Sequence, residues 1–450
     1  MRERILLADG WRQVGNVTAR GTVFDDGEPV HPATAFDGCR DAAAVRETAT
    51  AMTGFFAAVV AGADGTSLVC DRARSVPLYF SPTAISDVGT ELAPAVPTAY
   101  DPLAASEFAL TRYVTSGDTL HPDVQAVGAG EVVTVPDEPS QPIQRQRHSR
   151  YRPTAKQDGI TDEPETQALL DRLGEVADDV FDRVARVADG RPVVVPLSGG
   201  WDSRLVATEL VERGVEVVAF TFGAAGHADV EVSRDVADAL DIEWHWVEYT
   251  TERWHDWYHS DAREAYHDYA FGFDSLPFLA EWPAVAELLQ DGRLPENALV
   301  CPGHTVATPS ERVPAAWLAT DSLTGEDVIE YVLDSHYNCW EWNSSEFREQ
   351  FAGRIADAAG LDRSTENLTG GEAAAAYEQW EWATRMATFT NADCRLYEWF
   401  GFDWWLPLWD PEYVDFWASV PWRWASGTDA QKSTYSGSHS GSHQSNPNHS

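Results

Sequence analysis

The sequence predicts an α/β protein, with a β-rich N-terminal domain of α+β type and a C-terminal part that becomes largely helical. Short β-type runs broken by Gly, Pro and Asp recur through the first part of the chain, for example at 55–60, 67–70 and 131–135. From Thr161 onward, long helical patterns alternate with apolar strand-like runs. These changes divide the chain into residues 1–150, 151–424 and 425–450.

Two segments of the chain are polar: one lies at the boundary between the first two parts, and the other forms the third part. Residues 136–156 contain proline and are rich in Gln and Arg, which is typical of a linker. Residues 425–450 contain almost no apolar side chains and therefore cannot bury a core. We expect this low-complexity tail to be disordered.

The charge of the chain excludes several kinds of partner. The 450 residues include 72 acidic and 32 basic side chains, which gives a formal net charge of −40. Only Lys156 and Lys432 are lysines. Such a surface repels nucleic acids and anionic membranes. Acidity spread over the whole chain indicates a halophilic protein, because high salt screens the repulsion between like charges.

Cysteine spacing and hydropathy argue against metal-binding, disulfide-rich, secreted and membrane proteins. Five cysteines are scattered along the chain without a CxxC pair, so neither a zinc site nor a disulfide framework is indicated. The apolar stretch at the start is too short for a signal peptide, and no apolar run approaches the length of a membrane span. We therefore expect a cytoplasmic protein with free thiols.

The clearest functional signal is the segment 196–203, with the sequence PLSGGWDS. It follows the β-branched run 193–195 and precedes a helical pattern at 204–213. A second strand pattern at 215–222 completes a β-α-β unit. An ordinary strand–turn–helix connection is the alternative, but this context favours a nucleotide-binding loop.

Each residue of this loop suits a polyphosphate. Gly199 and Gly200 permit a tight turn and a close approach of the backbone to an anion. Free N–H groups at the start of the following helix, together with its dipole, favour negative charge. The hydroxyls of Ser198 and Ser203 add donors, and Asp202 can hold a divalent cation that neutralises the phosphates.

This loop resembles the pyrophosphate-binding loop (PP-loop) of the ATP-pyrophosphatases, which cleave ATP to AMP and pyrophosphate. Other blocks extend the resemblance to the glutamine-dependent asparagine synthetase family, and in particular to its asparagine-synthetase-related members. These blocks lie at 54–57, 71–79, 108–120, 128–133 and 401–410.

The resemblance implies a fold for each part of the chain. Residues 1–150 would form a layered antiparallel sheet domain of the Ntn-hydrolase type, a degenerate class II glutamine amidotransferase-like domain. Residues 151–424 would form a Rossmann-like PP-loop synthetase domain with a helical C-terminal part.

The resemblance also implies a reaction. In that family, the N-terminal domain hydrolyses glutamine, the synthetase domain adenylates a carboxylate, and ammonia displaces AMP to form an amide. ATP and Mg²⁺ would be the cofactors, and a small carboxylate and ammonia would be the substrates. No nucleic acid or membrane partner is expected, and a homodimer is possible. Asp202 and Ser198 would be catalytic, Asp202 would hold the metal, and the nucleotide would contact Leu197, Ser198, Gly199, Gly200, Asp202, Ser203, Thr221, Phe222 and Gly303.

Some positions depart from the family pattern. Class II amidotransferases use a cysteine directly after the initiator methionine, where this chain has Arg2, so we expect no glutaminase activity. One segment matches the family's acidic loop, but Ala307 and Thr308 occupy the positions where the family has acidic residues. Trp405 stands where the family commonly has Arg, and Lys432 is the only candidate for its C-terminal lysine.

These departures leave two hypotheses. The chain is either an ATP-dependent amide ligase that uses ammonia or an amine, or a degenerate nucleotide-binding paralogue with a regulatory or structural role. Because a tRNA-thiolating relative would need to bind a polyanion, the charge of −40 argues against that third class.

Three residues outside the loop allow more than one interpretation. Asp229 matches a family position near the nucleotide, but a helix N-cap explains it equally well. His255 and His259 are spaced to share a helix face and could chelate zinc. The aromatic residues around them favour a partly buried helix instead.

Overall fold

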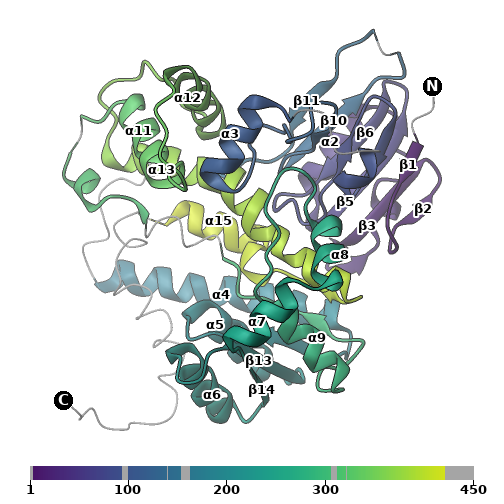
Figure 1. The fold of residues 1–450 in the computed structure, drawn as a ribbon, viewed down its shortest axis with the longest axis vertical. Helices are drawn as coiled ribbons and strands as arrows, with labels where there is room; N and C mark the ends of the chain where they lie inside the picture. Colours follow the sequence, from purple (N-terminus) through teal and green to yellow (C-terminus); the bar gives the residue numbers. More distant parts are fainter. Residues whose placement is uncertain are drawn as a thin grey trace.

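The computed structural model describes residues 4–93, 100–138, 140–153, 163–305, 312–320 and 322–420 (Figure 1). The predictions about the tail, Arg2, Ala307, Thr308 and Lys432 fall outside these residues. The α/β class is confirmed, since the described residues form several sheets and many helices. The domain boundaries at 150 and 424 stay predictions.

Two sheets form the N-terminal part of the chain, at the upper right of Figure 1. In the smaller sheet the order is β1 (Arg4–Leu6), β8 (Ala84–Ser86), β7 (Tyr79–Phe80) and β9 (Gln125–Ala126), with β1 and β8 parallel. In the larger sheet, which is antiparallel, the order is β11 (Gln144–Arg147), β10 (Glu131–Val135), β6 (Gly65–Cys70), β5 (Thr53–Gly62), β3 (Val17–Asp25) and β2 (Arg12–Val14), and β4 (Glu28–Val30) pairs with β3.

The central strand β5 shows why these sheets are layered. Its side chains alternate between two buried faces. Phe56, Ala58 and Val60 pack in a cluster with residues of the helices α1 (Pro32–Ala35) and α2 (Ala42–Ala51). Ala57 and Val59 pack against apolar residues of the smaller sheet, such as Phe80 and Ile85. The layers are therefore helix, sheet and sheet.

The predicted linker 136–156 contains a strand, which corrects that prediction. Within it, β11 pairs with β10 at the edge of the larger sheet. Its residues are all Gln or Arg, so it lacks the apolar alternation by which strands are recognised. Arg145 stabilises the strand through an ion pair of 2.9 Å with Glu131.

A parallel sheet organises the second part of the chain. The predicted β-α-β unit at 193–222 is confirmed, although its helix begins earlier, at Trp201. All neighbouring strands are parallel. In order across the sheet they are β14 (Glu243–Glu248), β13 (Val217–Gly223), β12 (Val193–Pro196), β15 (Leu299–Val300) and β16 (Asp403–Trp404).

This strand order is that of a Rossmann-like sheet. From β12 the chain moves outward through β13 to β14, and it then returns to build β15 on the other side of β12. The topological switch point lies between β12 and β15, where ligands bind in open α/β sheets. Helices accompany the strands: α4 (Glu163–Ala188), α5 (Trp201–Glu212), α6 (Ala228–Leu240), α7 (Thr251–Tyr258), α8 (Asp261–Ala270) and α9 (Trp282–Gln290).

A helical unit with its own apolar core lies at the upper left of Figure 1. Thr324 and Thr369 begin two of its helices with capping boxes, in which side chain and backbone satisfy each other's hydrogen bonds. The helices are α3 (Pro102–Thr111), α11 (Gly325–His336), α12 (Ser345–Ala359) and α13 (Gly370–Glu381).

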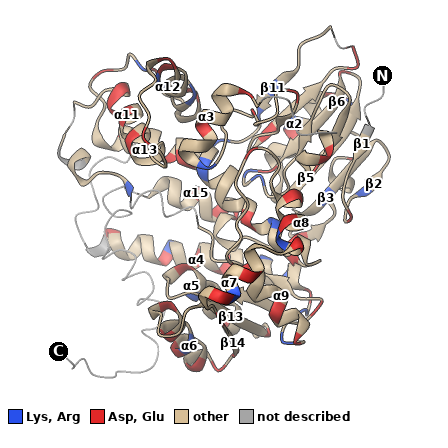
Figure 2. Cartoon of the chain, in the orientation of Figure 1, with Lys and Arg blue, Asp and Glu red and all other residues tan. Residues whose placement is uncertain are grey.

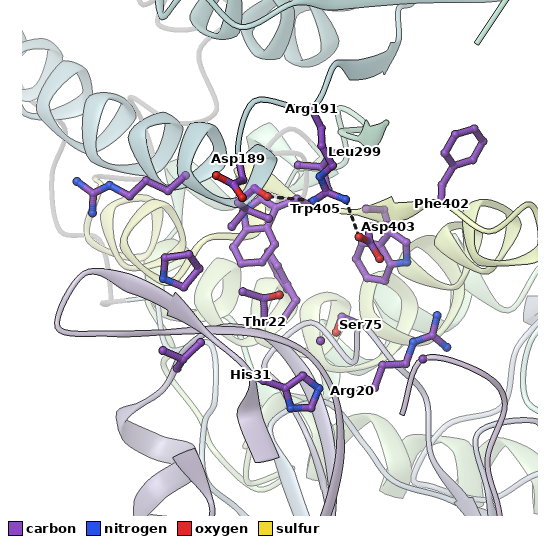
Figure 3. A pocket seen from close by; sticks show the side chains of 18 of the residues that line it. Arg20, Thr22, His31, Ser75, Asp189, Arg191, Leu299, Phe402, Asp403 and Trp405 are labelled. Carbon is purple, nitrogen blue, oxygen red and sulfur yellow. Dashed lines mark hydrogen bonds and ion pairs between the residues drawn. The ribbon is translucent and has the colours of Figure 1, made fainter. Parts of the chain in front are cut away.

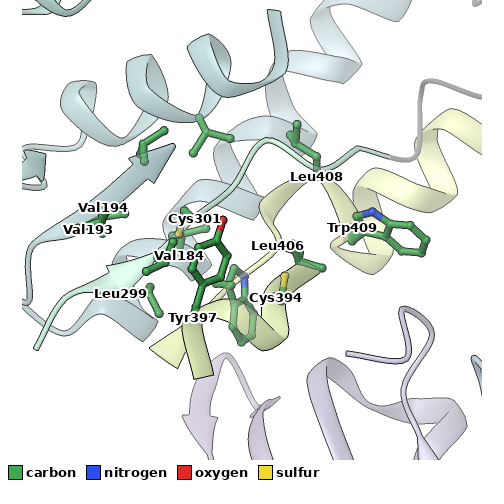
Figure 4. Packing of buried hydrophobic residues seen from close by; sticks show 14 of the residues in the cluster. Val184, Val193, Val194, Leu299, Cys301, Cys394, Tyr397, Leu406, Leu408 and Trp409 are labelled. Atoms are coloured by element: carbon green, nitrogen blue, oxygen red, sulfur yellow. The ribbon is translucent and has the colours of Figure 1, made fainter. Parts of the chain in front are cut away.

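The C-terminal segments return to the parallel sheet. A π-helix, η3 (Trp382–Thr390), continues α13 and leads into the 3₁₀-helix η4 (Asn391–Cys394). Next come α14 (Arg395–Trp399), η5 (Pro407–Trp409) and α15 (Pro411–Ser419). Val193 and Val194 of β12 share one buried cluster with Leu406 and Trp409 (Figure 4). Trp382, Trp405, Trp409 and Trp417 belong to this cluster and are therefore core residues.

A buried ion pair joins the N-terminal sheets to the second part of the chain. Arg74 lies 2.5 Å from Asp274, and both side chains are less than 5% exposed. The hydroxyl of Tyr79 donates a second hydrogen bond to Asp274, at 3.0 Å. Asn391 adds a hydrogen bond to the carbonyl of Ala73. The two parts are therefore linked through polar groups that have lost contact with water.

Acidic side chains lie on every part of the fold, and basic ones are far fewer (Figure 2). None of the described helices combines the length and apolar composition that crossing a bilayer requires.

We expect the thermal unfolding midpoint to rise as KCl is increased from 0.1 M to the molar range. The screening length falls from about 10 Å to about 3 Å over this interval, which weakens repulsion among the surface carboxylates. Scanning calorimetry at a series of KCl concentrations tests this. Sucrose of equal osmolality is the control, and a midpoint that falls with KCl would contradict a halophilic protein.

Candidate functional site

The loop after β12 is closed by its own hydroxyl groups. Ser203 Oγ accepts a hydrogen bond from the Ser198 backbone N–H at 3.1 Å and lies 3.0 Å from Ser198 Oγ. Ser198 Oγ in turn accepts from the N–H of Gly200 at 3.2 Å. The first loop residue, Leu197, continues the sheet through a 2.8 Å hydrogen bond to the Phe220 carbonyl. The two serines thus hold the turn in shape.

The helix α5 that follows has an N-terminus without a side-chain cap. Gly200 is its N-cap residue, and because glycine has no side chain it makes no side-chain cap bond to the first turn. The first N–H groups of a helix lack partners within the helix and attract anions. Asp202 lies in this first turn. Its negative charge, together with burial, raises the pKa of Tyr413 on α15. The carboxylate of Asp202 is therefore close enough to α15 to interact electrostatically with Tyr413.

A cavity of about 350 Å³ opens beside this loop. Residues at the carboxyl ends of β12, β13 and β15 line it, which places it at the switch point of the sheet. Of the residues expected to contact a nucleotide, the lining contains Leu197, Ser198, Gly200, Asp202, Ser203, Thr221, Phe222 and Gly303, but not Gly199. Their binding role stays a prediction.

Gly199 lies against Asp229 instead. Its N–H donates to Asp229 Oδ1 at 3.3 Å, and a Cβ atom on Gly199 would lie 2.5 Å from the same oxygen. His227, not Asp229, is the N-cap residue of α6. Asp229 also lines the cavity. The helix-cap interpretation is therefore wrong, and Asp229 belongs to the loop's surroundings.

Thr221 and Phe222 hold the neighbouring strand end in place. Thr221 is buried, and its Oγ1 lies 2.6 Å from the Leu197 carbonyl oxygen and 2.8 Å from Ser233 Oγ. The ring of Phe222 stacks on Tyr249 with centroids 5.3 Å apart. The hydroxyl of Thr221 thus joins two strand ends, while the half-buried Phe222 contributes an apolar wall.

Gly303 brings a second loop against the first. A Cβ atom at this position would lie 2.6 Å from the backbone nitrogen of Ser203 and 2.9 Å from its Cα. Real Cβ atoms do not approach backbone so closely. The chain after β15 therefore packs directly on the start of α5, and this contact requires glycine.

We expect Gly303→Ala to weaken ATP–Mg²⁺ binding at least tenfold, because one of the two loops must move. Isothermal titration calorimetry measures the affinity. Gly353→Ala in α12 is the matched control, since a Cβ there meets no atom within 4 Å. Equal affinities of both variants would show that the contact of Gly303 with Ser203 is unimportant for binding.

The electrostatic character of the cavity is acidic. Its lining contains Asp202, Asp229, Glu281 and Asp393, and among the described lining residues there is no Lys or Arg. His304 adds no positive charge at neutral pH, because burial lowers the pKa of its imidazole to about 4. Phosphates in this cavity would therefore need a metal ion to neutralise them, and a carboxylate such as that of Asp202 is the type of oxygen ligand that Mg²⁺ prefers.

Sequence reasoning missed the wall opposite the loop, formed by Glu281, Asp393 and Tyr397. In a chain with 72 acidic residues, individual carboxylates carry little information. One signal was present, because Glu281 interrupts an apolar stretch between Leu279 and Trp282. A buried ionisable group in a cleft is a candidate functional residue.

Trp405 lies away from this cavity. It lines a larger cavity of about 820 Å³ between the N-terminal sheet and the opposite end of the parallel sheet (Figure 3). Its ring makes an edge contact with Phe55, with centroids 4.6 Å apart, and it is only 2% exposed. The expectation that this residue replaces a phosphate-binding arginine is therefore not supported by its position.

The histidines of the aromatic segment lie on the surface of two short helices. The rings of His255 and His259 are 4.6 Å apart, and both residues are exposed. Across the part of the chain that the structure describes, no three His, Cys, Asp or Glu residues gather as a metal site. Contrary to the expected single helix, α7 ends at Tyr258 with His259 as its C-cap, and Ser260 is the N-cap of α8.

The sheet order, the switch point and the open helix N-terminus define a Rossmann-like PP-loop domain. Residues 175–280 match the family model of asparagine synthase. This segment carries the loop 197–203, so the chain contains an asparagine-synthase-type domain.

Other comparisons are weaker. A search of curated proteins gave no match. Among solved structures, the chain resembles an NH₃-dependent NAD synthetase from Campylobacter jejuni, with 16% identity over 44% of this chain and 75% of that chain, and a TM-score of 0.22. A predicted subunit of tRNA methyltransferase from Methanocaldococcus jannaschii has 16% identity over 36% and 74% of the two chains, with a TM-score of 0.16. At such TM-scores neither structure bears on the function of this chain.

Proposed function

We propose that this protein is an ATP-dependent amide ligase. It adenylates a small carboxylate, releases pyrophosphate, and transfers the acyl group to ammonia or an amine to form an amide. The observation that carries the proposal is the uncapped N-terminus of α5, which opens into the cavity at the switch point. The match of residues 175–280 to the asparagine synthase family supports the same reaction class.

Each group of the loop has a task in this proposal. The N–H groups at the start of α5 and the hydroxyls of Ser198 and Ser203 hold the phosphates in line with the attacking carboxylate. Asp202 would hold Mg²⁺, which supplies positive charge where negative charge develops on phosphorus. Phe222 offers an apolar surface to the adenosine. The acidic lining makes the metal necessary for binding as well as for chemistry.

The nitrogen donor in this proposal is ammonia or an amine rather than glutamine. A glutaminase needs a reactive thiol, but Cys70, Cys301 and Cys394 are fully buried, and burial raises the pKa of each. A thiol with a raised pKa is a poor nucleophile. Neither Cys39, which is also buried, nor the exposed Cys339 lines either of the two cavities described above.

Pyrophosphate release from ATP tests the proposal. The assay contains high KCl, Mg²⁺, ammonium and a panel of carboxylates led by aspartate. Release that requires both a carboxylate and Asp202 would support a ligase and identify its substrate class. ATP binding without pyrophosphate release would instead favour the nucleotide-binding paralogue. The absence of Lys and Arg from the described cavity lining also favours this alternative.

A further inference from the structure

The wall opposite the loop contains a buried carboxylate with an unused oxygen. Glu281, just before α9, is 7% exposed and lines the cavity. The hydroxyl of Tyr397 donates to its carboxylate. The other oxygen, Oε1, has no hydrogen-bond partner. Because an unpartnered buried acceptor is costly, this oxygen calls for a donor that the protein does not supply.

Glu381 also has a buried oxygen without a hydrogen-bond partner, but its other oxygen pairs with Arg312 and Arg385. Three further buried carboxylates likewise have an arginine partner, which Glu281 lacks. Asp274 pairs with Arg74, Asp410 with Arg183, and Glu107 with Arg354.

Glu281 has a second carboxylate beside it instead of an arginine. Asp393 lines the same cavity, and burial and the negative charge of Glu281 raise the pKa of Asp393, while the charge of Arg385 opposes this shift. Two neighbouring carboxylates that face a cavity attract a cation. The described residues include no third ligand that would complete a metal site. A compact cation that donates hydrogen bonds fits this wall better than a bare metal ion.

We propose that Glu281 and Asp393 bind the nitrogen donor as ammonium or a protonated primary amine, and that Glu281 accepts its proton. This inference rests on the proposed ligase activity. Glu281 removes one N–H proton, and the freed lone pair attacks the acyl carbon of the adenylate. The bond from that carbon to the phosphate oxygen breaks, and its electron pair leaves with AMP. A second N–H proton passes to water, which leaves a neutral amide.

The surroundings of Glu281 suit this role. Burial raises the pKa of its carboxyl group to about 7, although the hydrogen bond from Tyr397 opposes the shift. A general base works best when its pKa lies near the working pH. The other titratable groups that face it are Tyr249, Tyr266 and Cys394, and burial raises the pKa of each, so they are neutral at pH 7.

A binding experiment tests the cation site without any catalysis. The midpoint of thermal unfolding is measured with methylammonium chloride and with equal tetramethylammonium chloride, which has no N–H donors. We expect methylammonium to raise the midpoint of the wild type and of Glu287→Gln, but not of Glu281→Gln or Asp393→Asn. Glu287 is the matched control, because it lies on α9, the helix that Glu281 precedes, and pairs with Arg253 outside the cavity lining. Equal shifts in all four proteins, or none in the wild type, would overturn the site.

A kinetic experiment tests the proton transfer. Carboxylate-dependent exchange of pyrophosphate into ATP needs no nitrogen donor, so Glu281→Gln should retain it. We expect amide formation by this variant to fall about 10²–10⁴-fold. It should also lose the rise in rate that the wild type shows as the pH increases through 7. If exchange falls as much as amide formation, Glu281 acts in adenylation and the assignment is wrong.

These measurements separate the two proposals. A wild type that shows no exchange with any carboxylate contradicts the ligase activity. The unfolding experiment still decides whether Glu281 and Asp393 hold an ammonium group.

Discussion

Asp202→Asn is expected to abolish pyrophosphate release and to weaken ATP–Mg²⁺ binding by at least 10²-fold. The variant keeps the size of the side chain but removes the charge that would hold the metal in an acidic cavity. Loss of one group that stabilises the transition state typically costs 10²–10³ in rate. Titration calorimetry and a pyrophosphate assay measure the two effects.

Asp238→Asn is the matched control for Asp202. It makes the same change of charge at an exposed position of α6, outside the cavity lining. We expect it to behave as the wild type. If Asp202→Asn binds ATP–Mg²⁺ with unchanged affinity, the loop 197–203 does not hold the metal-bound phosphates.

Asp274→Ala is expected to destabilise the protein by about 3–5 kcal/mol. The guanidinium of Arg74 would stay buried without its counter-ion, and breaking a buried ion pair from one side has this cost. Tyr79 would lose the acceptor of its hydrogen bond as well. Urea unfolding at fixed KCl measures the free energy of unfolding.

Asp403→Ala is the control for the buried pair. Asp403 also pairs with an arginine, at 2.7 Å from Arg191, but its side chain is 75% exposed. We expect its loss to change the free energy of unfolding by less than about 1 kcal/mol. If both variants lose equal stability, burial does not distinguish the two ion pairs.

The sequence predicted the elements whose patterns are local. The valines 193–195, the glycines of the loop and the following helical repeat are adjacent in the chain, so their β-α-β unit could be inferred. Strand β11 was missed because its Gln and Arg residues form an edge whose pairing depends on Glu131 and the backbone of β10. The single helix expected around His255 failed because Ser260 favours a new helix start.

Of the candidate site, the sequence predicted the residues of the loop side but not Glu281 and Asp393. Gly303 was assigned through a family resemblance, and the structure gives the physical reason, which is its contact with Ser203. Glu281 and Asp393 are 112 residues apart in the chain and meet only after the C-terminal segment returns to the sheet. No local pattern marks such a pair. Trp405 was assigned to this site by its motif, although it packs on Phe55 in another cavity.

The two walls of the cavity come from separate segments of the chain. The loop after β12 forms one wall, while Glu281 just before α9 and residues of η4 and α14, which follow the π-helix η3, form the other. Under the proposed ligase activity, substitutions in the second wall would change which nitrogen compound is accepted and leave nucleotide binding unchanged. Such a division would make the site modular, because new amide products could be selected through one half while the half that binds ATP stays constant.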